Sequence, residues 1–199
     1  MSAPTMPPER PRLPWDPPEH FEKRVPEGDN RERLICNRCE FIHYQNPKIV
    51  AGAVCTWQDK ILIAKRAIEP RKGFWTLPAG YMELGETTEQ AAAREAREEA
   101  CATIEIERLL AMYSVARIGQ VHIMYRARLT KPDVAPGVES QDVALVDWAD
   151  IPWDQLAFPT VVWALAHFHE SRHKADFSAY SNPTGELARL WPPRKPAGV

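Results

Sequence analysis

The chain has 199 residues, a length that suits one domain with appendages. Its hydrophobic content of 44% allows a real core, and its formal net charge of −2 weighs against a protein that holds a nucleic-acid backbone in a broad basic field. No apolar run approaches the ~20 residues that cross a membrane, the N-terminus lacks the apolar region of a secretory signal, and four cysteines make no disulfide framework. We therefore expect a cytoplasmic protein with neither a membrane nor a nucleic-acid partner.

The N-terminal stretch, residues 1–24, is dominated by proline, and residues 1–26 hold eight of the 19 prolines. Proline lacks a backbone N–H and restricts its own φ, so such a stretch cannot sustain helix or ladder hydrogen bonds. We predict an extended arm, with Trp15 and Phe21 as the large apolar residues that could anchor it. The alternative is disorder.

A cysteine pair, Cys36 and Cys39, stands in the next segment, residues 25–47. This spacing is typical of half a zinc site, but tetrahedral structural zinc takes four ligands and no second pair follows. Cys55 and Cys101 fall inside an expected strand and helix of the core, and His20 and His43 are only possible substitute ligands. Two thiolates do not close the shell, so we expect no structural zinc.

Apolar runs after this segment predict strands. Residues 49–54 are short and apolar, as in a buried strand, and residues 61–66 form the return strand after a polar turn. The loop of residues 66–73 is rich in positive charge, and residues 74–80 lead from it into a glycine turn. Within residues 74–80, we expect the Trp75 side chain to pack in the core or to support the glycine turn.

A helix is predicted after the glycine turn. Thr87 can cap the first amides while Gln90 reaches back, and no Gly or Pro occurs from there to Glu99. Positions i, i+3 and i+4 share one helix face, which places the carboxylates of Glu95, Glu98 and Glu99 together. Such a face is often simply solvated. Crowded carboxylates are also what Mg²⁺ or Mn²⁺ binds, especially when phosphates complete the shell.

Beyond this helix, the pattern predicts two paired strands, a loop, a short strand and a last helix. Their ranges are 103–114, 121–129, 133–142, 144–148 and a helix from residue 159. The tail, residues 176–199, is again rich in proline. Leu187, Leu190 and Trp191 could form a short docking turn within it, and disorder is the alternative.

The spacing around the central helix resembles a known signature, the Nudix box. The matching residues are Gly80, Glu86 after five residues, and, after seven more, Arg94, Glu95, Glu98 and Glu99. The resemblance implies an α+β protein with the Nudix fold, an α/β/α sandwich with a central mixed sheet, over residues 48–175. The box normally has glycine where this chain has Cys101. A left-handed cysteine there would cost roughly 1–2 kcal/mol, unless the helix ends differently.

The segment of residues 25–47 is similar to the hairpin of zinc-ribbon Nudix proteins, which include ADP-ribose and FAD pyrophosphatases. It keeps the residues of that pattern at 26–29, 42–44 and 46–47, together with both cysteines. Prolines stand around residues 14–18, where the first cysteine pair belongs. Half of the zinc site is missing, so we expect a degenerate, ribbon-like hairpin that keeps its shape by packing.

The resemblance also implies which groups bind metal. The Mg²⁺ or Mn²⁺ ligands would be the Gly80 carbonyl and the carboxylates of Glu95, Glu98 and Glu99. Arg94 and Glu86 stand where the family uses them to hold these ligands, since a guanidinium can orient two carboxylates at once.

The general base and the phosphate contacts are less sharply defined. The base is left open among Glu98, Glu99 and Glu139, the last within a Gly-x-Glu-Ser piece that also resembles the subfamily. Arg66 and Arg71 belong to the loop and strand that the family places beside the substrate. We expect them to contact phosphate, with an ordinary surface position as the alternative.

The implied reaction is hydrolysis of a nucleoside diphosphate that is linked to another group. We expect a small-molecule substrate such as ADP-ribose, FAD or an NADH-like dinucleotide, giving AMP plus a phosphorylated product, and we expect a homodimer. One alternative is a non-catalytic nucleotide- or nucleic-acid-binding module on the same scaffold. Another is a Nudix-fold isomerase. The neutral charge weighs against the first alternative, and the intact glutamates weigh against both.

Overall fold

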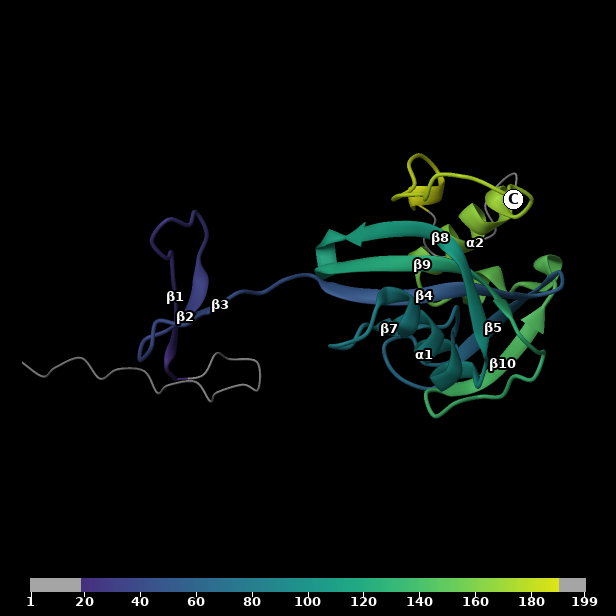
Figure 1. Cartoon of the computed structure of the whole chain (residues 1–199), viewed down its shortest axis with the longest axis horizontal. Helices are drawn as coiled ribbons and strands as arrows, with labels where there is room; N and C mark the ends of the chain where they lie inside the picture. The colour runs from purple at the N-terminus through teal and green to yellow at the C-terminus, as the bar shows by residue number, and fades with distance from the viewer. Residues whose placement is uncertain (1–18, 190–199) are drawn as a thin grey trace, which may run out of the picture. The chain divides into compact units, whose positions relative to one another are not determined.

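A computed structural model describes residues 19–189 of the chain (Figure 1). Within it, the chain divides between Asn46 and Pro47 into two compact units. The candidate anchors Trp15, Leu190 and Trp191 lie outside the described residues, as do the prolines at positions 14–18.

The first unit is a small antiparallel sheet with the strand order β1-β2-β3. Its strands are β1 (Phe21–Arg24), β2 (Arg33–Cys36) and β3 (Ile42–His43). Pairing starts earlier than the sequence suggested, because Phe21 lies opposite Cys36 and so joins the hairpin instead of the extended arm. Ile35, which is only 1% exposed, provides the small apolar centre of this unit.

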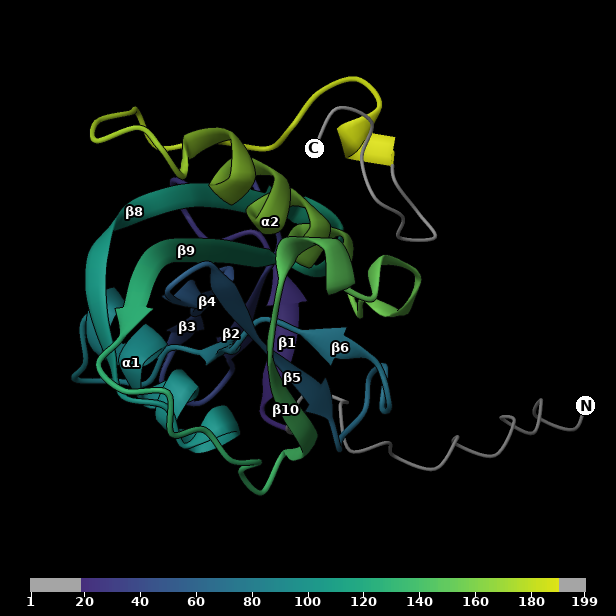
Figure 2. The ribbon, with the colours of Figure 1, turned by 90° about the vertical axis from the view of Figure 1, so that its right-hand side faces the viewer.

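The second unit is built on a seven-stranded mixed sheet (Figure 2). Its strands are β4 (Lys48–Trp57), β5 (Lys60–Arg66), β6 (Trp75–Thr76), β7 (Ala79–Tyr81), β8 (Ile104–Val115), β9 (Gln120–Leu129) and β10 (Ser140–Val146). The order is β10-β5-β4-β9-β8, with β6 paired to β5 and β7 paired to β4. Only β4 and β9 run parallel, and the other pairs are antiparallel.

Two helices cover the opposite faces of this sheet, α1 (Thr88–Ala100) and α2 (Pro159–Ser171). Strand β4 alternates between them, because Ala53 packs on the α1 side and Val54 on the α2 side. The expected α+β sandwich with a central mixed sheet is therefore confirmed. No helix among residues 19–189 has the length and apolar character needed to cross a membrane.

The helix α1 approaches the sheet closely because its inner face is made of alanine. The buried alanines are Ala91, Ala92, Ala96 and Ala100. They pack against Ala51 and Ala53 of β4, so small side chains meet on both sides of the contact. Close approach brings the glutamates at the edge of this face down to the sheet.

Residues 19–189 also contain four 3-10 turns: η1 (Ala116–Ile118), η2 (Trp148–Asp150), η3 (Trp153–Gln155) and η4 (Leu187–Arg189). Two expectations for this part of the chain are corrected. Strand β10 begins at Ser140, not at residue 144, because Ser140 and Asp142 pair with the end of β5. Trp148 belongs to η2 and not to the strand. As expected, Trp75 packs against the core on the α2 side.

Packing continues past residue 175 into the proline-rich tail. Tyr180 donates its amide to the Leu110 carbonyl and accepts from the Met112 amide, both at 2.9 Å. The Asn182 side chain accepts from the Ser114 amide at 2.7 Å and donates to the Ser114 carbonyl at 2.9 Å. Residues 180–182 therefore cover the outer edge of β8. Further along, Trp163 of α2 donates its indole N–H to the Leu187 carbonyl at 3.0 Å.

Both ends of α1 follow local chemistry. Thr87 and Gln90 make the reciprocal capping box that their sequence predicts. At the other end, Cys101 adopts the left-handed conformation, with φ 50° and ψ 22°. This chain therefore places a β-carbon where the family pattern has glycine. The helix ends in the left-handed conformation, and Cys101 bears the steric strain of that conformation.

Replacing Cys101 by glycine is expected to raise the free energy of unfolding by about 0.5–1 kcal/mol, because glycine adopts φ > 0 without steric cost. Chemical denaturation of the two proteins measures the difference. Cys101→Ala is the matched control, since alanine removes the thiol but keeps the strained β-carbon. Equal stabilisation by alanine and glycine would show that the backbone conformation is not the cause.

Candidate active site

Three glutamates of α1 meet the glycine turn of β7. Glu95 and Glu99 are buried between the helix and the sheet, whereas Glu98 is exposed. Gly80 pairs with Ala51 of β4, and a β-carbon added to it would lie 2.4 Å from both carboxylate oxygens of Glu95. Any side chain at this position would displace the Glu95 carboxylate, so glycine leaves room for that carboxylate beside the turn.

Arg94 joins the glutamates to the loop before the helix. Its Nε and Nη2 donate to the two carboxylate oxygens of Glu86 at 3.0 and 2.8 Å, a bidentate pair. Its Nη1 donates to Glu95 at 2.7 Å and to Glu98 at 3.0 Å. Nη2 also donates to the Tyr81 carbonyl at 3.0 Å. Arg94 thus fixes three carboxylates and the backbone beside Gly80 at once.

The surroundings of the carboxylates shift their pKa values in different directions. Hydrogen bonds from the Arg94 guanidinium, together with one from the Glu83 amide, lower the pKa of Glu86 to about 2. Burial raises the pKa of Glu99 to about 8, although the Ala79 amide donates to its Oε2 at 3.1 Å. Burial also raises the pKa of Glu95, against the opposing effect of Arg94. Burial of Glu95 and Glu99 therefore outweighs the contacts that favour their charged forms.

The loop between β9 and β10 closes against the end of α1. The amides of Ala135 and Gly137 donate to the carbonyls of Ala100 and Glu99, both at 3.0 Å. A β-carbon added to Gly137 would lie 1.6 Å from the Glu98 carbonyl oxygen, so only glycine permits this contact. The loop satisfies helix carbonyls that have no partner within the helix.

The same loop carries Glu139 to the carboxylate cluster. The Glu139 carbonyl accepts from the Ala67 amide at 2.7 Å, which ties the loop to the end of β5. The charge of Glu139 contributes to the raised pKa values of both Glu95 and Glu99. The structure thus brings the expected loop glutamate near the helix, although the two are about 40 residues apart in the sequence.

Of the two expected phosphate-binding arginines, Arg66 is the one whose charge lowers the pKa of Glu99. Its Nε donates to the Pro70 carbonyl at 2.8 Å, and its guanidinium lies 5.2 Å from the centre of the Phe158 ring. Within residues 19–189, its two terminal nitrogens donate no hydrogen bond to protein. Arg71 instead lies 3.7 Å from the ring centre of Phe74, within its own loop.

The donor set fits a hard divalent cation. Within the described part of the chain, each helix glutamate keeps one oxygen without a protein donor: Oε2 of Glu95, Oε1 of Glu98 and Oε1 of Glu99. Among residues 19–189, no three acidic, histidine or cysteine side chains already converge as ligands. Glu95 and Glu98 accept hydrogen bonds from Arg94, and Glu99 accepts one from the Ala79 amide.

The sequence did not predict the contacts of the Tyr81 carbonyl and of Gly137. Phe158 was considered only as an aromatic residue that could stack on a base, and the structure places its ring against Arg66. A signal for Gly137 was present, because it stands between a proline and the Glu139 that was singled out.

Both parts of the chain match known protein families. Residues 46–170 match the NUDIX domain family, and residues 19–45 match the family described as Nudix N-terminal. The crystal structure of a NUDIX hydrolase from Nitrosomonas europaea is 45% identical, with a TM-score of 0.76, and the match covers 81% of this chain and 93% of that one. Both expected resemblances and the expected fold are confirmed.

Two curated relatives are more distant. An ADP-ribose pyrophosphatase of Methanocaldococcus jannaschii is 29% identical over 119 residues, which are 58% of this chain and 69% of that protein. A NAD-capped RNA hydrolase NudC of Vibrio vulnificus is 38% identical over 72 residues, which are 35% of this chain and 26% of that protein.

Proposed function

This chain belongs to the Nudix hydrolase family, and on that premise we propose that it hydrolyses a nucleoside diphosphate linked to a second group, with release of AMP. ADP-ribose, FAD and NADH-like dinucleotides are the substrates that we propose to test first. The observation that carries the proposal is the cluster of Glu95, Glu98, Glu99 and Glu139, in which burial raises the pKa of Glu95 and Glu99 although Arg94 pairs with Glu95.

We propose that Mg²⁺ or Mn²⁺ is held by Glu95, Glu98, Glu99 and the Gly80 carbonyl. A divalent cation lowers the pKa of bound water and neutralises charge that develops on phosphoryl oxygens. The bidentate pair of Arg94 with Glu86 would hold the ligands in place, because the same guanidinium also donates to Glu95 and Glu98.

The remaining roles follow from the other contacts. Glu139 is proposed as the base or as an outer metal ligand, since its loop is tied both to α1 and to β5. Glu98 and Glu99 stay as alternatives for the base. The terminal nitrogens of Arg66 are proposed to bind a substrate phosphate, because Phe158 and the Pro70 carbonyl already hold the guanidinium beside Glu99.

The test is a panel of nucleoside diphosphate derivatives incubated with the full chain and Mg²⁺ or Mn²⁺, with AMP measured by chromatography. We expect AMP release from at least one dinucleotide or nucleotide sugar, and complete loss when a chelator removes the metal. NAD-capped RNA belongs in the panel because one relative carries that name.

Turnover of none of these compounds, or turnover that survives the chelator, would contradict the proposal. Calorimetric binding of a panel compound without turnover would favour the non-catalytic module instead.

A further inference from the structure

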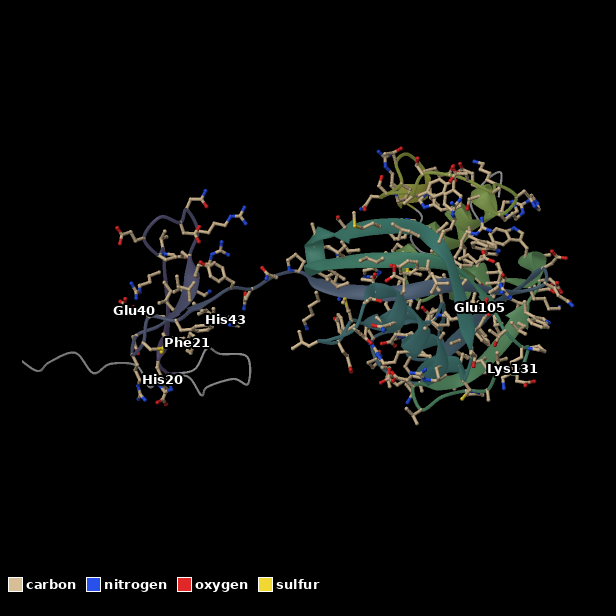
Figure 3. The ribbon with its side chains drawn as sticks, viewed as in Figure 1. His20, Phe21, Glu40, His43, Glu105 and Lys131 are labelled. Atoms are coloured by element: carbon tan, nitrogen blue, oxygen red, sulfur yellow. The ribbon has the colours of Figure 1, made fainter. Side chains whose placement is uncertain are left out.

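Beyond the active site, two thiols share one turn of the N-terminal unit. Cys36 ends β2, and Cys39 lies in the turn that leads to β3. The Glu40 amide donates to the Cys36 carbonyl at 2.8 Å, and the Cys36 amide donates to the Phe41 carbonyl at 2.9 Å. Glu40 closes the turn with φ 57°. These contacts keep both cysteines in one tight turn, and Figure 3 shows Glu40 and His20 at this end of the hairpin.

The two sulfurs differ in access. The Cys36 side chain is buried, at 7% exposure, whereas Cys39 is exposed. The amides of Arg38 and Cys39 donate to the Cys36 sulfur, and these hydrogen bonds, with one from the Cys39 thiol, lower the pKa of Cys36. An accessible thiol therefore lies next to a protected sulfur that is stabilised as a thiolate.

The family implies zinc at this place, and the residues of this chain do not fit it. Structural zinc takes four ligands. Residues 1–18 contain no cysteine or histidine. Among residues 19–189, no group of three or more potential ligands is placed to hold a metal ion. The β1-β2-β3 sheet forms around Ile35 with two thiols that no closed metal site accounts for.

We propose that Cys36 and Cys39 form a redox-active dithiol that closes to an intramolecular disulfide on reaction with a small disulfide. The exposed Cys39 thiolate attacks one sulfur of the small disulfide and releases one thiol. The Cys36 thiolate then attacks the Cys39 sulfur of this mixed disulfide and releases the second thiol. Both cysteines are oxidised, the small disulfide is reduced to two thiols, and the two cysteine protons leave on those thiols.

The other cysteines serve as internal controls. Cys55 is fully buried, and burial raises its pKa to about 12, so it should stay unreacted. Cys101 is exposed at the end of α1 and has no other cysteine within its turn, so it should stop at the mixed disulfide.

The experiment treats the reduced full chain with oxidised glutathione and identifies the products by mass spectrometry. Trypsin cleaves after Arg38, so a disulfide is seen as two linked peptides, residues 34–38 and 39–48. We expect the linked pair to exceed glutathione-modified Cys39 roughly tenfold or more, because the second attack is intramolecular. In Cys36→Ser, Cys39 should instead keep its glutathione, as Cys101 does in the native chain.

Three results would overturn the proposal: a stable glutathione adduct on Cys39 in the native chain, no reaction at Cys39, or one zinc ion per chain that protects both thiols. None of these outcomes depends on nucleotide hydrolysis. The glutathione experiment can therefore be interpreted even if the proposed enzyme activity is not found.

Discussion

Glu98→Gln is expected to lower kcat/KM for AMP release about 10³-fold. Glutamine keeps the shape of the side chain and an oxygen that can accept from Arg94, where the distance is now 3.0 Å. It lacks the negative charge that a divalent cation needs. Steady-state kinetics with saturating Mg²⁺ on the substrate found in the panel would measure the loss.

The fold should tolerate this change. The Glu98 side chain is 55% exposed, so losing its ion pair should cost less than about 1 kcal/mol of stability. Glu105→Gln is the matched control, since Glu105 is an exposed glutamate of β8 that pairs with Arg128 (Figure 3). Glu105→Gln should retain full activity. Native turnover by Glu98→Gln would refute the proposed metal ligands.

Gly137→Ala is expected to lower kcat at least about 10²-fold and to destabilise the protein by roughly 1–3 kcal/mol. The added β-carbon would lie 1.6 Å from the Glu98 carbonyl oxygen, which belongs to the helix backbone and cannot rotate away. The loop must move, and with it the amides that cap α1 and the side chain of Glu139. Kinetics and chemical denaturation measure the two effects.

Val138→Ala separates this effect from a general sensitivity of the loop. Val138 is the neighbouring residue and is 94% exposed, so shortening it should change neither quantity. If Gly137→Ala kept native kcat despite its loss of stability, the proposed role of Glu139 would be wrong. A variant with native stability as well would show that the loop does not pack as described.

Local chemistry made the helix α1 predictable. Its cap depends on Thr87 and Gln90, three residues apart, and its carboxylate face follows from helical periodicity alone. For the helix end at Cys101, the sequence left two alternatives open, and the structure adopts the left-handed one. These features lie within one or two turns of the residues that cause them.

Features that depend on distant partners were not predictable in the same way. Strand β10 starts at Ser140 because the end of β5 pairs with it, and β1 includes Phe21 because Cys36 lies opposite. The sequence indicated Glu139 but not the close contact of Gly137 with the Glu98 carbonyl, which depends on how the loop crosses α1. The sequence also did not show that Tyr180 and Asn182 bind β8, because this contact depends on β8 being the outer strand of the sheet.

The covering of β8 by residues 180–182 has a consequence for how the chain is made. Asn182 leaves the ribosome 68 residues after Ser114, the residue whose amide and carbonyl it satisfies. Until then, the nascent sheet presents an unpaired strand edge, which is a template for pairing with another chain. A chain cut at residue 175 would keep that open edge permanently, since it lacks the partners of Leu110, Met112 and Ser114. Residues 180–182 are therefore expected to protect this edge from aggregation, and they are synthesised only after the proposed site residues.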